Sequence, residues 1–380
     1  ADQFVVNRNT FHPETHQEKT GKTVIAGYPW FGDWGRDTAI ALPGLTLATG
    51  RPEIARQILL TFARYSDRGM VPNVFPERGE IPQYNTVDAA LWYVEAVRAY
   101  AAKTGDRDFL ETVFPTLQSI VDWHQRGTRY GIQLDAEDGL LYAGEPDSQL
   151  TWMDAKIGDW AITPRIGKPI EINALWYNAL RVTAACARWL DRSDRDYVQM
   201  AERAAASFER FWIGDRGYCY DVLDPPDGND DSFRPNQIFA VSLPDRDSAY
   251  PALLDLPRRQ AIVTAVARNL LTSYGLRSLH PNHPDYRDRY GGDPVQRDSG
   301  YHQGPVWGWL LGAYVRAYVQ TGGSRDVGRS LLEPMRYHLR DACLGTLSEI
   351  FEGAPPFTPR GAFAQAWTVA EVLQTWQWLS

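Results

Sequence analysis

The sequence is poor in cysteine and has no block of positive charge. Its three cysteines, at positions 186, 219 and 343, lie far apart and form no Cys-x-x-Cys pair. Neither a disulfide framework nor a zinc site is therefore predicted. No apolar run reaches the roughly 18 residues of a membrane span, which argues against insertion in a bilayer. The net charge of −8, with no cluster of Lys and Arg, argues against nucleic acid as a partner.

Several sequence motifs are missing as well. The phosphate-binding patterns GxxxxGK[ST] and GxGxxG do not occur, and neither does the serine-hydrolase pattern GxSxG. We therefore expect no nucleotide cofactor, no metal and no serine nucleophile.

The composition is otherwise that of a globular protein. Of the 380 residues, 44% are hydrophobic and 23% are charged, which predicts a packed core. The 14 Trp and 19 Tyr suggest aromatic surfaces in addition to that core. The use of cysteine fits a reducing cytoplasm. Because the chain opens at Ala1 without a Met, we expect one domain over residues 1–380 that belongs to a longer protein.

The chain reads as a series of helical hairpins. Tight junctions made of a Gly or polar cap followed by Asp, Ser or Pro recur near residues 50, 105, 193 and 323. Helices are predicted over residues 36–49, 53–65, 87–103, 108–128, 171–190, 195–212, 236–244, 257–272, 304–320, 325–340 and 364–379. The end of a helix within residues 1–10 would bring the count to twelve. The pattern favours an all-α fold, an (α/α)6 barrel, over an open α-solenoid.

The unusual motifs fall in the long connections between hairpins, which should gather at one mouth of the barrel. Asp154 follows Trp152 and Met153. Apolar neighbours raise the pKa of a carboxyl group, and a protonated carboxyl can act as a general acid. Glu349, flanked by apolar residues, is a second candidate carboxylate. Each could also be an ordinary acidic residue of a surface loop.

Other residues of these motifs are candidates for binding a sugar, because rings stack on its C–H faces and polar groups hold its hydroxyls. Asp33 and Asp37 could equally cap a helix and Arg36 could form a surface pair, Asn85 could be an N-cap, and His302 is more consistent with a hydrogen-bonding role than with a metal ligand. The full set is Trp30, Asp33, Trp34, Arg36, Asp37, Asn85, Asp88, Trp152, Glu171, Asn173, Tyr177, His302, Trp307, Gln365 and Trp367.

Taken in order, these segments resemble the glucosidase domain of glycogen debranching enzymes of the bacterial and archaeal type. The matching stretches are residues 26–37 (AGYPWFGDWGRD), 41–45 (ALPGL), 84–88 (YNTVD), 151–154 (TWMD), 348–351 (SEIF) and 365–367 (QAW). The resemblance implies an (α/α)6 barrel that removes α-1,6-linked glucose from the trimmed branches of glycogen or a related α-glucan, with inversion. Asp154 would be the general acid and Glu349 the general base, with Glu352 a second candidate for the base.

The resemblance also implies a geometry. An inverting pair of carboxyls is separated by about 6.5–9.5 Å, which leaves room for the attacking water.

Family members usually carry a further N-terminal domain, and larger ones a transferase barrel, so we expect this chain to lack transferase activity. Three other functions stay open. One is another inverting glycosidase on the same barrel, acting on trehalose, a glucosylglycerate or a mannoside. The second is a carbohydrate-binding barrel without turnover, and the third is a helical scaffold for protein partners, against which the clustered carboxylates argue.

Overall fold

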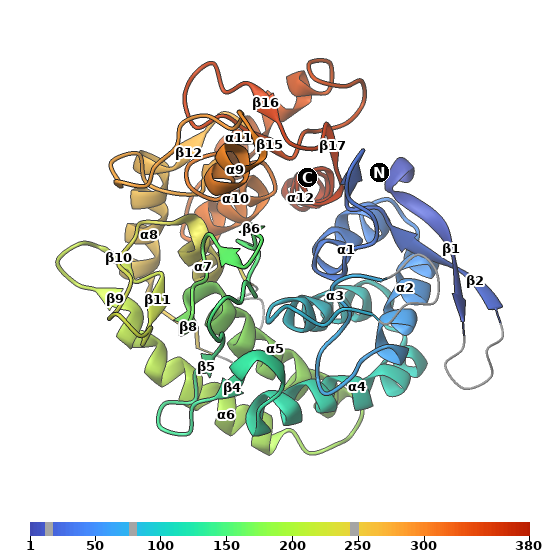
Figure 1. Cartoon of the computed structure of the whole chain (residues 1–380). Helices are drawn as coiled ribbons and strands as arrows, with labels where there is room; N and C mark the ends of the chain where they lie inside the picture. Colours follow the sequence, from blue (N-terminus) through green and yellow to red (C-terminus); the bar gives the residue numbers. More distant parts are fainter. Residues whose placement is uncertain (12–17, 76–81, 244–250) are drawn as a thin grey trace.

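The helices form two concentric rings (Figure 1). The structure, a computed structural model, describes residues 1–11, 18–75, 82–243 and 251–380. Each inner helix contacts the next and α12 contacts α1, so the inner ring is closed. The inner helices are α1 (Gly35–Leu42), α3 (Ala89–Thr104), α5 (Ile170–Trp189), α7 (Phe239–Ser242), α10 (Leu310–Gln320) and α12 (Ala366–Leu379). This closure confirms the predicted (α/α)6 barrel and excludes an open solenoid.

The outer helices are amphipathic, as their position requires. In α2 the residues Ala55, Ile58, Leu59 and Phe62 recur on one face and are buried. Burial of each of the three larger side chains contributes about 1.5–3 kcal/mol to folding. The inner helix α5 is buried over nearly its whole length. Within the described ranges the outer helices are α2 (Pro52–Arg64), α4 (Arg107–Arg126), α6 (Arg195–Phe208), α8 (Leu256–Asn269) and α11 (Arg325–His338).

The predicted tight junctions are present. Gly105 ends α3 in the left-handed region with φ 66°, where a residue without Cβ is favoured. Asp106 then caps α4 by accepting a hydrogen bond from the Phe109 N–H at 2.9 Å. Such caps turn the chain from an inner helix into an outer one within two residues.

Short strands lie in the long connections. The sequence contains little sign of them because most have only two residues. One sheet has the order β12 (Leu271–Thr272), β13 (Gly275–Arg277), β14 (Val306–Trp307), β15 (Ile350–Phe351) and β16 (Pro359–Arg360). The paired strands are β1 (Val5–Phe11) with β2 (Glu18–Val24), β3 (Gly27–Tyr28) with β17 (Ala364–Gln365), β4 (Gln133–Leu134) with β5 (Leu141–Tyr142), β6 (Lys156–Ile157) with β7 (Trp160–Ala161), β8 (Lys168–Pro169) with β11 (Val222–Leu223), and β9 (Trp212–Ile213) with β10 (Tyr218–Cys219).

The structure corrects three local predictions. Of the helix end predicted within residues 1–10, only a 3-10 turn at Asp2–Phe4 is present. Residues 5–11 instead form strand β1 of an antiparallel hairpin with β2. Among the residues that the structure describes, the twelfth α-helix is instead α9 (Pro294–Gly300), in the connection between β13 and β14. Helix α10 starts at Leu310 and not at residue 304, because Val306 and Trp307 pair with β13 and β15. Residue 244, the predicted end of the helix over 236–244, lies outside the described residues.

The connections that carry the motifs gather at one end of the barrel, where the inner helices α1, α3 and α12 begin (Figure 1). Strand β17 pairs with β3, which places Gln365 opposite Gly27. This pairing brings the first and last motifs of the chain together. A Cβ on residue 27 would lie 2.0 Å from the amide end of the Gln365 side chain, so a larger residue there would displace that amide.

Candidate active site

A small cavity of about 60 Å³ opens at the mouth of the barrel, and residues from distant parts of the chain line it. Its lining consists of Phe31, Trp34, Arg36, Asp37, Trp152, Asp154, Tyr301, Trp307, Glu349, Gln365 and Trp367. Both candidate carboxylates therefore face one cavity. Acidic groups and aromatic rings together make a surface suited to a sugar.

Arg36 organises the acidic side of this cavity. Its side chain, only 2% exposed, extends from the first turn of α1. Its Nε donates to both carboxylate oxygens of Asp88 at 2.8 Å, and its Nη1 donates to Asp154 Oδ2 at 2.7 Å. Its Nη2 donates to the Thr151 carbonyl at 3.0 Å. One guanidinium thus ties α1 to the start of α3 and to the loop that carries Asp154.

The setting of Asp154 differs from the apolar one expected from the sequence. Its side chain is 28% exposed and forms an ion pair with Arg36. Trp152 and Met153 are themselves buried, and the side chains of both contact Asn236. The apolar residues next to Asp154 in the sequence therefore did not predict the positive charge of Arg36 beside it in the structure.

Asp37 is a carboxyl group held in the cavity wall. Among the described residues, none donates a hydrogen bond to its side chain. Burial raises its pKa to about 8, and the nearby charges of Asp154, Glu349 and Asp88 act in the same direction, while Arg36 opposes them. A buried carboxyl with free oxygens can accept hydrogen bonds from sugar hydroxyls or, when protonated, donate one to them.

Glu349 lies immediately before β15 and is 2% exposed. Burial raises its pKa to about 7, and the charge of Asp154 adds to that effect. Two donors oppose the shift: the Tyr301 hydroxyl donates to Oε1, and the Ala362 N–H donates to Oε2 at 2.8 Å. Gly361, with φ 67°, passes so close that a Cβ there would lie 2.2 Å from Oε2. The carboxyl is therefore fixed in orientation and can change its protonation near neutral pH.

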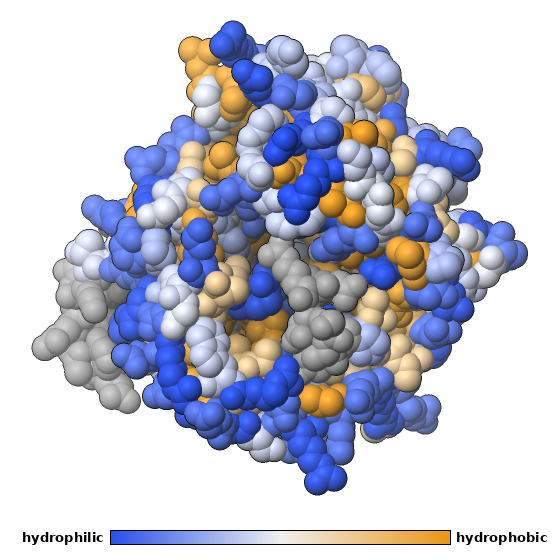
Figure 2. Space-filling view, turned by 180° about the vertical axis from the view of Figure 1, so that it is seen from behind, coloured by the Kyte–Doolittle hydropathy of each residue, from blue (hydrophilic) through white to orange (hydrophobic). Residues whose placement is uncertain are grey.

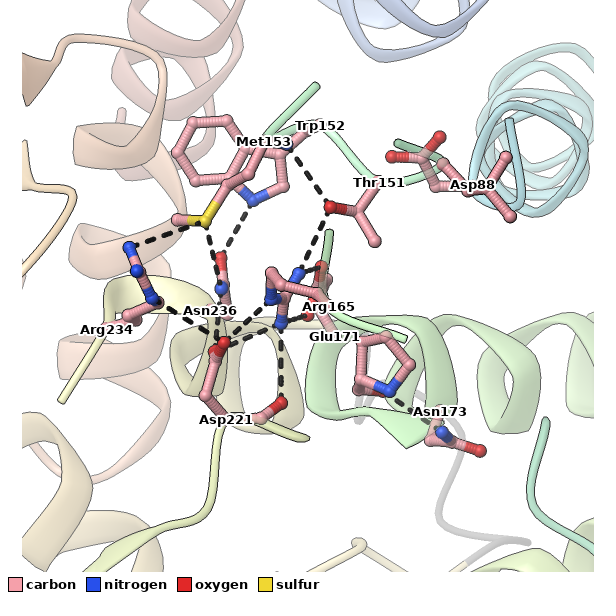
Figure 3. A network of polar contacts seen from close by, with 12 residues as sticks. Asp88, Thr151, Trp152, Met153, Arg165, Glu171, Asn173, Asp221, Arg234 and Asn236 are labelled. Carbon is pink, nitrogen blue, oxygen red and sulfur yellow. Dashed lines mark hydrogen bonds and ion pairs between the residues drawn. The ribbon is translucent and has the colours of Figure 1, made fainter. Parts of the chain in front are cut away.

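The loop that leads to Asp154 rests on a buried polar network (Figure 3). Arg165 is 2% exposed and donates to Asp221 Oδ2 at 2.7 Å and to Glu171 Oε2 at 2.6 Å. Asn236 donates to Asp221 at 2.8 Å and accepts from Trp152 Nε1 at 2.8 Å. The network holds the Trp152 ring, and with it the backbone two residues before Asp154.

Aromatic rings form the floor of the cavity. Trp152 contacts Trp307 and Trp309 edge to face, with ring centroids 5.1 and 5.4 Å apart. Trp309 stacks on Trp367 at 4.9 Å. His302 stacks on Trp307 at 4.9 Å, and its ring nitrogens have no hydrogen-bond partner among the described residues. Its expected hydrogen-bonding role is thus not seen there, and burial lowers its pKa well below the usual value.

The cavity gathers some of the predicted residues but not others. Of the sugar-binding candidates, Trp34, Arg36, Asp37, Trp152, Trp307, Gln365 and Trp367 line it. Trp30 is 68% exposed and is not part of the lining. The candidates Asp33, Asn85, Asp88, Glu171, Asn173, Tyr177 and His302 do not line the cavity either.

Most of these other candidates are occupied by internal contacts. Asp33 accepts from Thr23 Oγ1 at 2.6 Å, and Glu171 pairs with Arg165. Asn173 accepts from the Leu141 N–H at 2.7 Å. Tyr177 donates to a backbone carbonyl, and Asn85 is 3.4 Å from the Asn73 amide. Helix position alone could not distinguish such contacts from groups that face the cavity.

Two lining residues were absent from the predicted set, Phe31 and Tyr301. Both lie inside motifs that the sequence had marked. Glu352, the second candidate base, forms an ion pair with Arg360 at 2.8 Å and does not line the cavity.

In the described part of the chain, no group of His, Cys, Asp and Glu is arranged to hold a metal. None of the described helices is long and apolar enough to cross a membrane.

Comparison with protein families gives a match over nearly the whole chain. The model of the family described as amylo-alpha-1,6-glucosidase matches residues 1–374. The chain is 26% identical to the glycogen debranching enzyme of Saccharomyces cerevisiae over 391 residues, which cover 78% of this chain and 25% of the yeast protein. It is 25% identical to neutral/alkaline invertase 1, mitochondrial, of Oryza sativa, over 68% of this chain and 46% of that protein. The chain thus spans less than half the length of either relative.

Solved structures share the fold. The GH63 mannosylglycerate hydrolase of Thermus thermophilus, in complex with glucose, superposes with a TM-score of 0.71 at 16% identity, covering 93% of this chain and 95% of that one. An uncharacterized conserved protein of the same organism superposes with the same TM-score and coverage. At this identity the likeness concerns the architecture alone.

Proposed function

This chain belongs to the amylo-alpha-1,6-glucosidase family, and we propose that it hydrolyses the α-1,6-linked glucose left at trimmed branch points of glycogen or a related α-glucan, with inversion at the anomeric carbon. The family makes the chain a glycoside hydrolase. The choice of substrate and the residue roles are the proposal.

One observation carries it: Asp154 and Glu349, 195 positions apart in the sequence, line the same ring-walled cavity. Glycoside hydrolysis uses a pair of carboxyl groups, one on each side of the bond that breaks. A helical scaffold that only binds protein partners would not need two carboxyl groups in one cavity with a third, Asp37, beside them. The cavity therefore favours an enzyme over a scaffold.

The reaction divides between these two groups. In this assignment Asp154 gives a proton to the glycosidic oxygen as the bond to the anomeric carbon breaks. Glu349, in its ionised form, takes a proton from the water that attacks the opposite face. The hydrogen bonds from Tyr301 and Ala362 stabilise that ionised form and aim its oxygens. Arg36 holds Asp154 in place beside the sugar.

The rest of the cavity supports removal of a single terminal sugar. Asp37 and Arg36 offer hydrogen bonds to its hydroxyls, and Trp307 and Trp367 offer ring faces. A cavity of about 60 Å³ is much smaller than the sites of about 300–1,000 Å³ that enclose larger ligands. We infer that the glucan chain beyond the cleaved bond lies outside the cavity.

A substrate panel tests the proposal. Free glucose should appear from a phosphorylase-and-transferase-trimmed dextrin and from panose. It should not appear from trehalose or sucrose, and mannosylglycerate should stay intact. Proton NMR of the fresh product should show the β-anomer first, as inversion requires. Preferential cleavage of mannosylglycerate or trehalose would replace this substrate, and binding of glucan without turnover would place the protein among binding modules.

A further inference from the structure

Two exposed aromatic rings flank the catalytic cavity without lining it. Trp30 is 68% exposed and Phe363 is 42% exposed. Trp30 directly precedes Phe31, which lines the cavity, and Phe363 lies two positions before Gln365, which lines it as well. We call Trp30 and Phe363 together the aromatic rim.

Strand pairing holds the two rings at one corner of the mouth. The antiparallel register pairs Tyr28 of β3 with Ala364 of β17. Trp30 follows two residues after Tyr28, and Phe363 comes one residue before Ala364, so both extend from the same end of the paired strands. The fold thus brings together two rings that belong to opposite ends of the sequence.

Hydrogen bonds tie both segments to the wall of the cavity. The Phe31 N–H donates to the carbonyl four residues earlier at 2.8 Å, which closes a tight loop that contains Trp30. The Ala362 N–H, one residue before Phe363, donates to Glu349 Oε2 at 2.8 Å. Each ring is therefore next in sequence to a residue that lines the cavity or holds the proposed base.

Packing within the fold does not account for these rings. Neither belongs to the hydrophobic core or to the residues packed against it, and neither has an aromatic or cationic partner in the described part of the chain. A single exposed hydrophobic side chain is ordinary on a protein surface, whereas a contiguous apolar patch marks a binding surface. The aromatic rim is such a patch, and it is continuous with the cavity.

The size of the catalytic cavity indicates what covers the rim. At about 60 Å³ the cavity suits a single terminal sugar, so the rest of a branched glucan leaves across its edge. An α-glucan is uncharged, and its C–H faces pack on aromatic rings while its hydroxyls stay in water. Neither ring carries a charge that would select an ionic ligand.

We propose that the aromatic rim binds the glucan chain on the leaving-group side of the cleaved bond. The inference rests on the proposed function and narrows its substrate class to a glucose stub on an α-1,4-linked chain. The rings of Trp30 and Phe363 pack against glucose units of that chain. The chain thereby contributes binding that a substrate of one sugar does not have.

Kinetics with and without the outer chain test the rim. Trp30→Ala and Phe363→Ala should each lower kcat/KM for the trimmed dextrin about tenfold, mainly through KM. Hydrolysis of α-glucosyl fluoride, which has no chain beyond the cleaved bond, should change less than about twofold. Trp30→Tyr keeps a ring and should retain most of the activity on the dextrin.

Trp189→Ala is the matched control. Trp189 is 39% exposed and, like the rim, is not packed on the core. It ends the inner helix α5, so it lies at the end of the barrel opposite the mouth. Figure 2 views the molecule from that end, whose surface is mostly hydrophilic. This variant should change the kinetics on neither substrate.

Calorimetry with maltoheptaose separates binding at the rim from the reaction, because this linear α-1,4-glucan has no α-1,6 bond. The unaltered chain should bind it, and Trp30→Ala should bind it at least about fivefold more weakly. Binding through Trp30 without hydrolysis of the dextrin would support the rim as a glucan site and reject the proposed function.

Two outcomes would overturn the rim while leaving the proposed function intact. In the first, the dextrin is hydrolysed and the rim variants cleave it and bind maltoheptaose as the unaltered chain does. In the second, Trp30→Ala abolishes self-association in sedimentation and leaves the dextrin kinetics unchanged, which would make the rim an interface between copies of this chain.

Discussion

The guanidinium of Arg36 donates to the carboxylate of Asp154 at 2.7 Å, although the two residues are 118 positions apart. The same guanidinium holds Asp88. The proposed acid is therefore not in an apolar niche of its own loop but is anchored by the first turn of an inner helix. Around this anchor, the carboxyls with raised pKa that line the cavity are Asp37 and Glu349.

Asp154→Asn should abolish hydrolysis of panose but spare hydrolysis of α-glucosyl fluoride. Fluoride leaves without a proton, so the loss of a general acid matters little for that substrate. We expect a fall of at least about a thousandfold in kcat/KM for panose and less than about tenfold for the fluoride. Equal losses on both substrates would contradict the assignment of Asp154 as the acid.

Glu349→Gln should lose turnover on both substrates, because each needs an activated water. Sodium azide, a nucleophile that needs no base, should restore reaction with α-glucosyl fluoride and give β-glucosyl azide. Glu352→Gln is the matched control: its ion pair with Arg360 lies outside the cavity, so it should keep most activity. If Glu352→Gln were the inactive variant, the base would be reassigned.

The kcat/KM of the enzyme should fall as the pH drops below about 7. Glu349, with a pKa of about 7, is protonated there and cannot take a proton from water. The Tyr301 hydroxyl lowers this pKa, so Tyr301→Phe should move the acidic limb of the profile to higher pH. Tyr290→Phe is the control, since the Tyr290 ring lies 5.2 Å from that of Tyr301 but makes no hydrogen bond to Glu349 within the described residues. An unmoved limb in Tyr301→Phe would contradict this account.

Asp37→Asn should stabilise the fold, and more so at higher pH. The folded-state pKa of Asp37 is raised from the ordinary 3.8 to about 8, so the folded protein binds a proton that the unfolded chain releases. The contribution of Asp37 to the free energy of unfolding is fully present below pH ~4 and is lost as the pH rises through about 8. The Tm difference between the variant and the unaltered chain should widen over that window and level off above it. Parallel Tm curves would show that Asp37 does not titrate in this way.

Arg165→Met should destabilise the protein strongly. It leaves the buried carboxylate of Glu171 without its cation and leaves Asp221 with only the longer contact to Arg234 at 3.8 Å. Breaking a buried pair in this way costs about 3–5 kcal/mol. Urea unfolding gives the change. Arg216→Met is the control, because its ion pair with Asp231 is about half exposed on both sides. Arg216→Met should leave the urea midpoint of unfolding unchanged. A similar loss of unfolding free energy in both variants would mean that the buried network stabilises the fold no more than an exposed ion pair does.

The helical pattern determined the architecture in advance. Apolar residues with helical spacing, as in α2 and α5, and caps such as Gly105 and Asp106 are local signals, and local signals can be recognised in a sequence. The alternation of long and short connections then placed the motifs at one mouth. The resemblance of those motifs to a known family assigned the roles of general acid and general base to two residues already singled out, Asp154 and Glu349.

Only the tertiary structure decided what surrounds each charge. Glu171 and Asp37 are both acidic residues in the first turn of an inner helix, yet Glu171 is paired with Arg165 while Asp37 faces the cavity. Asp154 was interpreted from its neighbours in the chain, Trp152 and Met153, but its environment is set by Arg36. The physical reason is that burial and Coulomb interaction depend on distance in space, and a closed ring of helices brings together residues that the sequence keeps far apart.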